Sequence, residues 1–224
     1  MTVHLRRLTR RFPGRPVLDG ISLDMAPGEF AALIGKSGSG KTTLLRAIAG
    51  LDDGVEGEGI VRVPDGRSIL FQDSRLLPWL SVLSNVTLGL RTPDSEERGH
   101  AALVDVGLSG REDAWPNELS GGEQQRAALA RSLVRHPELL LADEPFGALD
   151  ALTRSRMHEL MFRLVERYRP TVLLITHDVE EALVPCRPGA GHGSGVGSFS
   201  TVPLPCRIHG GSLTPPSNGS EVNY

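Results

Sequence analysis

The stretch Gly35-Lys36-Ser37-Gly38-Ser39-Gly40-Lys41-Thr42 decides the fold class of this chain. It fits the pattern G-x-x-x-x-G-K-[ST], and it lies between an expected strand over Phe30–Ile34 and an expected helix over Thr43–Ala49. The glycines let the backbone wrap an anion, so that successive N–H groups and the positive helix end face phosphate oxygens. An ordinary glycine-rich turn is the alternative, and both flanks argue against it. The stretch therefore predicts a nucleoside triphosphate site.

Two side chains of this loop have a direct chemical task. Lys41 would bring a cation near the β and γ phosphates, and Thr42 would present its hydroxyl to Mg²⁺ that bridges phosphate oxygens. ATP and Mg²⁺ are therefore the expected cofactors. The candidate nucleotide-binding residues of the loop are Gly35, Lys36, Ser37, Gly38, Ser39, Gly40, Lys41, Thr42 and Thr43.

Composition limits the other possibilities. A chain of 224 residues with 39% hydrophobic content can bury one substantial core. The formal net charge of -3 offers no strong field for attracting nucleic acid, so we expect no such partner. No apolar stretch is long enough to cross a bilayer, which favours a soluble, cytoplasmic protein. The two cysteines, Cys186 and Cys206, indicate neither a disulfide framework nor a cysteine metal site.

Apolar strands alternate with helical segments up to about Thr176, which predicts an α/β fold. We expect a P-loop NTPase core with a largely parallel sheet covered by helices. Residues 72–135 have helical patterning but no comparable strand, so we interpret them as an inserted helical lobe. The domain is expected to span residues 1–184. The clearest strands are Phe30–Ile34, Leu139–Ala142 and Val172–Ile175.

Two adjacent carboxylates follow the apolar strand Leu139–Ala142. Asp143 and Glu144 would lie at its carboxyl end, the edge at which ligands bind in parallel sheets. Because consecutive strand residues point to opposite faces, the two acids are expected to have different tasks. Asp143 suits Mg²⁺, and Glu144 suits a base that polarises the attacking water. A solvated strand end is the alternative for the pair taken alone.

The segment Leu119-Ser120-Gly121-Gly122-Glu123, followed by Gln124-Gln125-Arg126, resembles the signature motif of ABC ATPases. Ser120, Gly121 and Gly122 open a helix, which makes a second anion-binding end. In the family, the phosphate bound there belongs to ATP held by the opposite subunit. The resemblance extends from about Val3 to Val184 and implies the ABC ATPase fold.

The other motifs of that family appear in the family's order. Phe12 resembles the aromatic that stacks on adenine, and Asp150 ends the Ala148-Leu149-Asp150 D-loop, which is implied to contact nucleotide. Gln72 resembles the lobe-junction glutamine, implied in catalysis and in Mg²⁺ binding. His177 resembles the switch histidine, implied in catalysis. Each residue also has a purely structural alternative. Phe12 could be a core aromatic and Asp150 a helix cap, whereas Gln72 could be a solvated loop residue and His177 a core imidazole.

A narrower resemblance points to a group of importers. Phe71–Trp79 and Leu149–Arg154 resemble the corresponding stretches of ATPases that serve nitrate, sulfonate and taurine import, with the aliphatic sulfonate group closest. The resemblance implies a homodimer, two membrane-spanning permease subunits, an indirect solute-binding protein and a peripheral location at the cytoplasmic face of the inner membrane. Leu76, Leu77 and Trp79 would help receive a permease helix, or they would form lobe core.

Beyond Val184 the sequence leaves the family pattern. Residues 185–224 are rich in Gly, Pro and Ser, without periodicity, and predict an irregular tail. Reading the codons from Pro185 onward one base later, with CGN for arginine and TCN for serine, permits Leu-Ala-Asp-Arg-Val-Leu-Val-Met-Asp-Arg-Gly, which resembles the family's continuation. A single-base shift is therefore our hypothesis, and a natural disordered tail is its alternative.

This tail also bears on activity. If it is genuine, a core strand would be missing next to the one that delivers His177, and we expect low solubility and weak ATPase activity. Two other functions stay open: a non-transport ABC ATPase and a nonfunctional remnant. The first would usually carry tandem cassettes or a long coiled-coil insertion, and the sequence has neither.

Overall fold

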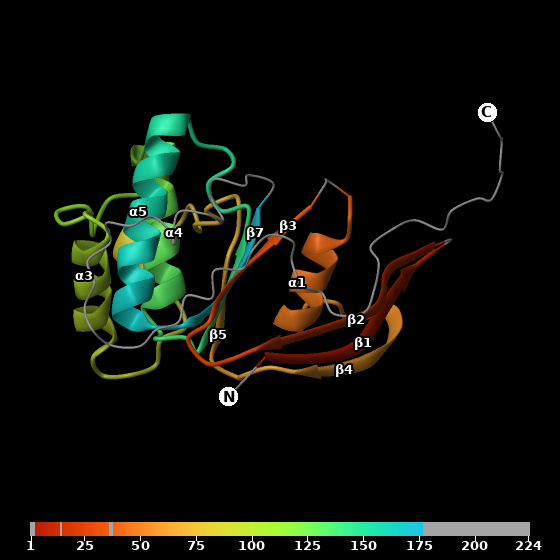
Figure 1. Ribbon diagram of the computed structural model, residues 1–224. Coiled ribbons are helices and arrows are strands. Elements are labelled where there is room, and N and C mark those ends of the chain that lie inside the picture. The colour runs from red at the N-terminus through yellow and green to blue at the C-terminus, as the bar shows by residue number, and fades with distance from the viewer. Residues whose placement is uncertain (1–2, 14, 36–37, 177–224) are drawn as a thin grey trace, which may run out of the picture.

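The computed structural model describes residues 3–13, 15–35 and 38–176. A four-stranded sheet forms the centre of this part of the chain (Figure 1), with the strand order β3-β7-β6-β5 and parallel pairing throughout. The predicted parallel sheet is confirmed. The strands are β3 (Phe30–Ile34), β5 (Arg67–Leu70), β6 (Leu139–Asp143) and β7 (Thr171–Thr176).

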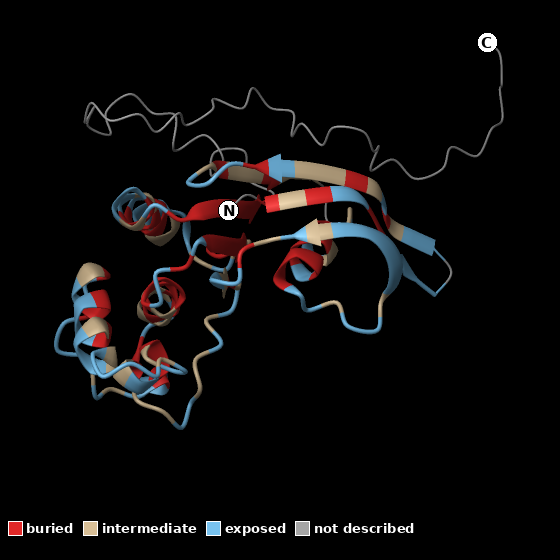
Figure 2. Ribbon diagram, turned by 90° about the horizontal axis from the view of Figure 1, so that it is seen from below, coloured by how far each residue is buried: buried red, intermediate tan, exposed pale blue. Residues whose placement is uncertain are grey.

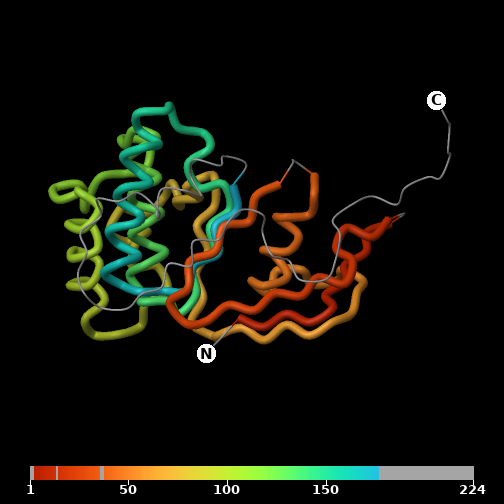
Figure 3. The backbone as a smooth tube through the Cα atoms, viewed as in Figure 1, coloured from red at the N-terminus to blue at the C-terminus, as the bar shows by residue number. Residues whose placement is uncertain are grey.

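A second sheet is antiparallel and was not predicted. Its order is β2-β1-β4, and β1 pairs with both neighbours. The tube in Figure 3 shows helix α1 (Lys41–Ala49) between this sheet and the parallel one. Leu44, Leu45 and Ile48 of α1 are buried there, in a cluster with side chains of both sheets. The strands are β1 (Val3–Phe12), β2 (Arg15–Met25) and β4 (Glu56–Arg62).

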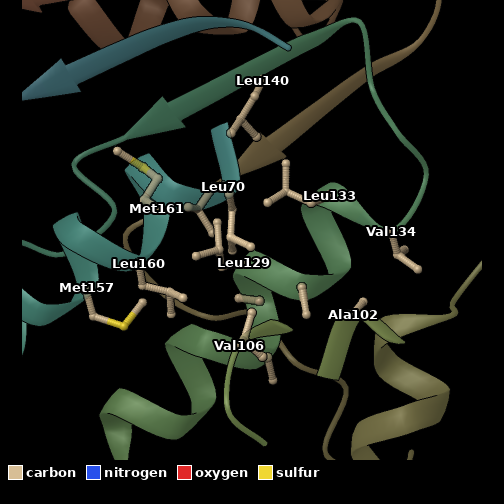
Figure 4. Close-up of a cluster of buried hydrophobic side chains, with 14 of the residues drawn as sticks. Leu70, Ala102, Val106, Leu129, Leu133, Val134, Leu140, Met157, Leu160 and Met161 are labelled. Carbon is tan, nitrogen blue, oxygen red and sulfur yellow. The ribbon is translucent and has the colours of Figure 1, made fainter. Parts of the chain in front are cut away.

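Helices cover the other face of the parallel sheet. Figure 2 marks the buried residues along these helices, and Figure 4 shows part of the apolar cluster that they share with β5 and β6. Three of the helices and one 3-10 turn lie in the predicted lobe, so its helical character is confirmed. The elements are α2 (Val82–Val86), α3 (Ser95–Asp105), η1 (Pro116–Glu118), α4 (Gly121–Leu133) and α5 (Ala151–Tyr168).

One expectation about the sheet is wrong. We expected the tail to remove a strand next to the one leading to His177, but β7 is paired on both sides, with β3 and with β6. Any additional strand can therefore join only at β3 or β5, the outer strands of the order in the described residues. His177 and residues 185–224 lie outside the described residues. The helix after the phosphate loop begins at Lys41 rather than Thr43, because Gly40 already serves as its N-cap.

Packing between α4 and the sheet should dominate the stability of the helical face. Leu129 is fully buried in the cluster, whereas Leu152 on α5 is 62% exposed. We predict that Leu129→Ala lowers the free energy of unfolding by about 2–5 kcal/mol, because the side chain leaves a cavity in a packed core. Leu152→Ala is the matched control and should change it by roughly 0.5 kcal/mol or less. Urea denaturation monitored by circular dichroism measures both; equal midpoints would contradict the prediction.

Candidate functional site

Gly40 sets the conformation of the phosphate loop. Its φ of 93° is left-handed, and an added Cβ would lie 2.9 Å from the carbonyl oxygen of Val17 on β2. Only glycine satisfies both conditions without strain. The loop is therefore pressed against the hairpin of β1 and β2, while the N–H groups of α1 stay available to an anion.

The side chains beside this turn fit a phosphate ligand. The Lys41 ammonium is buried and donates a 2.7 Å hydrogen bond to the carbonyl oxygen of Gly35. The hydroxyl of Ser39 is buried and has no hydrogen-bond partner among the described residues. A buried polar atom without a partner is costly, so a ligand oxygen at this point would stabilise it. Lys36 and Ser37, which complete the predicted cradle, lie outside the described residues.

Thr42 and Asp143 meet at the end of β6. The Thr42 hydroxyl donates to Oδ1 of Asp143 over 3.4 Å. Burial raises the pKa of the Asp143 carboxyl above its usual value, the hydrogen bond from Thr42 lowers it, and the neighbouring charge of Glu144 raises it again. A hydroxyl and a carboxylate side by side are oxygen ligands of the kind that Mg²⁺ takes, so these residues fit that ion.

Glu144 leaves the strand in a strained conformation. Strand β6 ends at Asp143, and Glu144 has a φ of 45°, which is uncommon outside glycine. Its N–H donates to the carbonyl oxygen of Ile175 on β7, and its own carbonyl accepts from the N–H of Gly147. The backbone thus turns directly after Asp143, and Glu144 does not continue the extended strand. The expectation that the two acids alternate as consecutive extended strand residues is therefore wrong.

Gln72 lies at the same edge. A Cβ built on Gly147 would be 3.6 Å from Nε2 of Gln72 and 3.9 Å from Cβ of Glu144, so the three residues are neighbours. The structure therefore brings Gln72 next to the Glu144 loop.

Gln125 is a site residue that the sequence analysis did not single out. It is buried on α4, and its amide nitrogen donates to the carbonyl oxygens of Phe71, Gln72 and Pro145. These carbonyls belong to the loops after β5 and β6. The signal in the sequence was an amide side chain on an expected helix, four residues after Gly121. Its hydrogen-bond partners depend on tertiary structure and could not be predicted.

The signature segment forms a second helix start. Ser120 is the N-cap of α4, and a reciprocal capping box links it to Glu123. The hydrogen bonds from the Ser120 hydroxyl and N–H hold the pKa of the Glu123 carboxyl below its usual value. A Cβ on Gly122 would lie 3.1 Å from Cγ2 of Thr153, whereas Gly121 has nothing within 4 Å. There is open space beside Gly121, whereas any side chain at Gly122 would press on Thr153 of α5.

Asp150 and Phe12 differ in how they fit their expected roles. Asp150 is the N-cap of α5 and accepts from the N–H groups of Leu152 and Thr153, so the alternative of a helix cap is confirmed. The hydrogen bonds to Thr153 also lower the pKa of its carboxyl. Phe12 is 41% exposed at the end of β1 and is therefore not a core aromatic. It lies on the hairpin whose Val17 abuts the phosphate loop.

Residues 73–81 form a segment that hydrogen bonds from the lobe hold in place. Arg131 of α4 donates to the carbonyl oxygens of Ser74 and Arg75, and the buried Asn85 amide bonds both the N–H and the carbonyl of Leu77. Leu76 packs against the core, as the alternative for it proposed, whereas Trp79 is 67% exposed. The segment is held from inside and presents an aromatic side chain outward.

The described part of the chain contains no cluster of three metal-ligating side chains and no membrane-spanning helix. Among residues 3–13, 15–35 and 38–176, no group of three or more His, Cys, Asp or Glu side chains could hold a metal by itself. Within the same part of the chain, no helix is long and apolar enough to span a membrane.

The raised pKa of Asp143 has a measurable consequence. In the folded protein its ionised form is disfavoured, so stability falls as pH rises from the usual value of 3.8 through the raised value. We predict that Asp143→Asn raises the Tm of the nucleotide-free protein at neutral pH and that the gain disappears below pH 3.8. The exposed Asp53→Asn is the control. Differential scanning calorimetry across pH measures the effect; a lower Tm for Asp143→Asn at neutral pH would contradict it.

Comparison with known proteins gives the family. The family described as ABC transporter matches residues 18–147, more than half of the chain. The aliphatic sulfonates import ATP-binding protein SsuB 2 of Rhizobium johnstonii is 64% identical over 181 residues, which cover 81% of this chain and 73% of that protein. The protein of the same name from Streptomyces avermitilis is 67% identical over 182 residues, with the same shares.

Among solved structures, the dimeric, post-hydrolysis state of the ATP-binding cassette MJ0796, bound to ADP and Pi, is similar. The TM-score is 0.67 at 32% identity, and the match covers 81% of this chain and 90% of that one. The chain belongs to the ABC transporter family, as one of its ATP-binding, ATP-hydrolysing subunits.

Proposed function

We propose that this chain hydrolyses ATP in a head-to-tail homodimer that drives import of an aliphatic sulfonate. One observation supports the proposal of a dimer. Ser120, Gly121 and Gly122 line a cavity with the D-loop and α5, and none of the described residues of the phosphate loop lines it. An anion-binding helix end that is separate from the chain's own phosphate loop calls for a phosphate from a second copy. The relative MJ0796 is dimeric with ADP and Pi bound.

In the proposed site each residue has one task. Phe12 stacks on adenine, and the loop Gly35–Thr43 binds the phosphates, with Lys41 supplying a cation. Thr42, Asp143 and Gln72 would hold Mg²⁺, which when bound neutralises charge on the phosphate oxygens. Ser120, Gly121 and Gly122 of the partner contact the γ-phosphate, and Asp150 contacts the partner across the interface.

Hydrolysis is proposed to need a general base and a side chain that contacts the γ-phosphate. Glu144 accepts a hydrogen bond from the attacking water and raises its nucleophilicity. His177 contacts the γ-phosphate; it follows Thr176 at the end of β7, outside the described residues. Because Glu144 is fixed by its hydrogen bond to β7, base and histidine would start from adjacent strand ends.

The transported solute is proposed from the relatives. Two aliphatic sulfonates import proteins share 64% and 67% of the aligned residues with this chain. Taurine and nitrate are related anions that the sequence resemblance also admits. We propose two permease subunits as membrane partners, with a solute-binding protein acting through them and no nucleic acid involved. The exposed Trp79 on the braced segment 73–81 is the proposed permease contact. Such a subunit would lie peripherally on the cytoplasmic face of the inner membrane.

Glu144→Gln tests the hydrolytic role. The amide cannot act as a base, so we predict that turnover falls about 10²- to 10⁴-fold while ATP affinity changes little and the ATP-bound dimer persists. Glu159→Gln on the exposed side of α5 is the matched control and should keep parental turnover. Steady-state phosphate release and size-exclusion chromatography with ATP measure these effects. Parental turnover in Glu144→Gln would remove Glu144 from its role.

We also propose that the natural continuation after Val184 is encoded one base later than the recorded reading frame. Relatives align over 181 and 182 of the 224 residues, and the shifted triplets permit the family's continuation. The residues concerned lie outside the described part of the chain. The domain would then end in a continuation of the family type rather than in the Gly-, Pro- and Ser-rich tail.

Genomic sequencing across codons 184 and 185 decides the reading frame, and we predict one extra base there. Removing that base should give a soluble protein with higher ATPase activity than the 224-residue chain. An in-frame gene without an extra base would refute the shift. The Glu144 and Glu159 variants are made in both forms, so that a parent with turnover is available for comparison.

A further inference from the structure

A cavity of about 750 Å³ lies between the helical lobe and α5. Its wall comes from the end of α3, the start of α4, the D-loop and one face of α5. The volume is in the range of small-molecule sites. Part of its mouth is the signature segment, but most of the lining has no task in the proposed ATPase mechanism.

Three arginines give this cavity its charge. Arg126 of α4 and Arg156 and Arg163 of α5 line it; Arg126 interacts electrostatically with Glu123, whereas Arg156 and Arg163 make no hydrogen bond or ion pair in the described part of the chain. Arg156 and Arg163 are seven residues apart on α5, so they lie on the same side of the helix, two turns apart. Guanidinium groups of this kind bind oxyanions through paired N–H donors.

The carboxylates of the same lining are already engaged. Asp105 accepts from the Tyr168 hydroxyl at 2.6 Å and pairs with Arg167, and burial together with Asp105 raises the pKa of Tyr168 to about 12. Asp150 caps α5 through two backbone N–H groups. Neither carboxylate pairs with Arg156 or Arg163, so the cavity keeps a positive rim along α5.

The floor of the cavity is apolar. Val106, Met157 and Leu160 line it and are at most 7% exposed, and Figure 4 shows all three in the cluster beneath the helices. Val104 adds an apolar side chain that is 60% exposed. A positive rim over an apolar floor matches a ligand with an anionic head and a short hydrocarbon chain.

We propose that this cavity binds an aliphatic sulfonate, with its sulfonate on the arginines and its alkyl chain on Met157 and Leu160. The identity of the ligand rests on the proposed function, because an aliphatic sulfonate is the proposed cargo. A bound sulfonate beside Ser120 and Gly122 occupies the approach of the partner's γ-phosphate. The imported solute therefore inhibits ATP-driven closure from the cytoplasmic side.

Calorimetric titration of the nucleotide-free protein with hexane-1-sulfonate tests the site. Sodium sulfate and hexan-1-ol separate the contributions of the head and the chain, and sodium hexanoate tests the choice of sulfonate. We expect hexane-1-sulfonate to bind at least tenfold more tightly than any of the three. The Arg156→Ala, Arg163→Ala double variant should weaken it roughly tenfold to a hundredfold, because hydrogen bonds to charged groups are lost. Arg91→Ala, an exposed arginine outside the cavity, should bind like the parent.

ATPase inhibition gives the second readout. Hexane-1-sulfonate should inhibit the parent and the Arg91 variant, with weaker inhibition at high ATP, and should leave the double variant uninhibited at unchanged basal turnover. Equal binding of sulfate or of hexanoate, or undiminished binding by the double variant, would overturn the proposal. If binding is absent while Glu144→Gln still traps an ATP dimer, the cavity proposal fails and the ATPase proposal stands. A parent without ATP-dependent dimerisation would instead contradict the proposed function, whatever the titration gives.

Discussion

The amide of Gln125 is the connection on which the arrangement of the site depends. It joins a helix of the inserted lobe to the loops after β5 and β6 through three backbone carbonyls. The loop after β5 carries Gln72, and the loop after β6 carries Glu144. The helix that bears Gln125 has Ser120 as its N-cap. A rotation of the lobe would therefore move the signature segment and, at the same time, disturb the sheet edge where hydrolysis is proposed. Because the amide is buried, water cannot replace these bonds at little cost.

The bracing of residues 73–81 extends this connection outward. Arg131 lies on the same helix as Gln125 and bonds the carbonyls of Ser74 and Arg75. A displacement of residues 73–81 would thus act on a helix that also contacts the loops after β5 and β6. Two-way communication between a membrane partner and the nucleotide needs only this helix to have two positions, each favoured by a different set of contacts.

Much of the site was predictable because its motifs are contiguous in sequence. The phosphate loop, the parallel strands Phe30–Ile34 and Leu139–Ala142 and the helix start at Ser120 follow from local chemistry, namely glycine placement, apolar runs and capping. The antiparallel sheet was missed because β1, β2 and β4 are rich in charged residues, and their bulged pairing obscures a period of two. Gln125 was missed because its partners come from residues more than fifty positions earlier and from Pro145. The wrong place given to the missing strand has the same origin, since strand order is a tertiary property.

At Glu144 the backbone conformation favours glycine, whereas the proposed reaction needs a carboxylate side chain. Glycine would adopt this φ at no steric cost, whereas a residue with a Cβ accepts a less favourable conformation. The turn after Asp143 would form more easily without the carboxylate that it carries. A stability-driven redesign of this chain would therefore favour glycine at this position, and it would remove the carboxylate that the proposed hydrolysis requires.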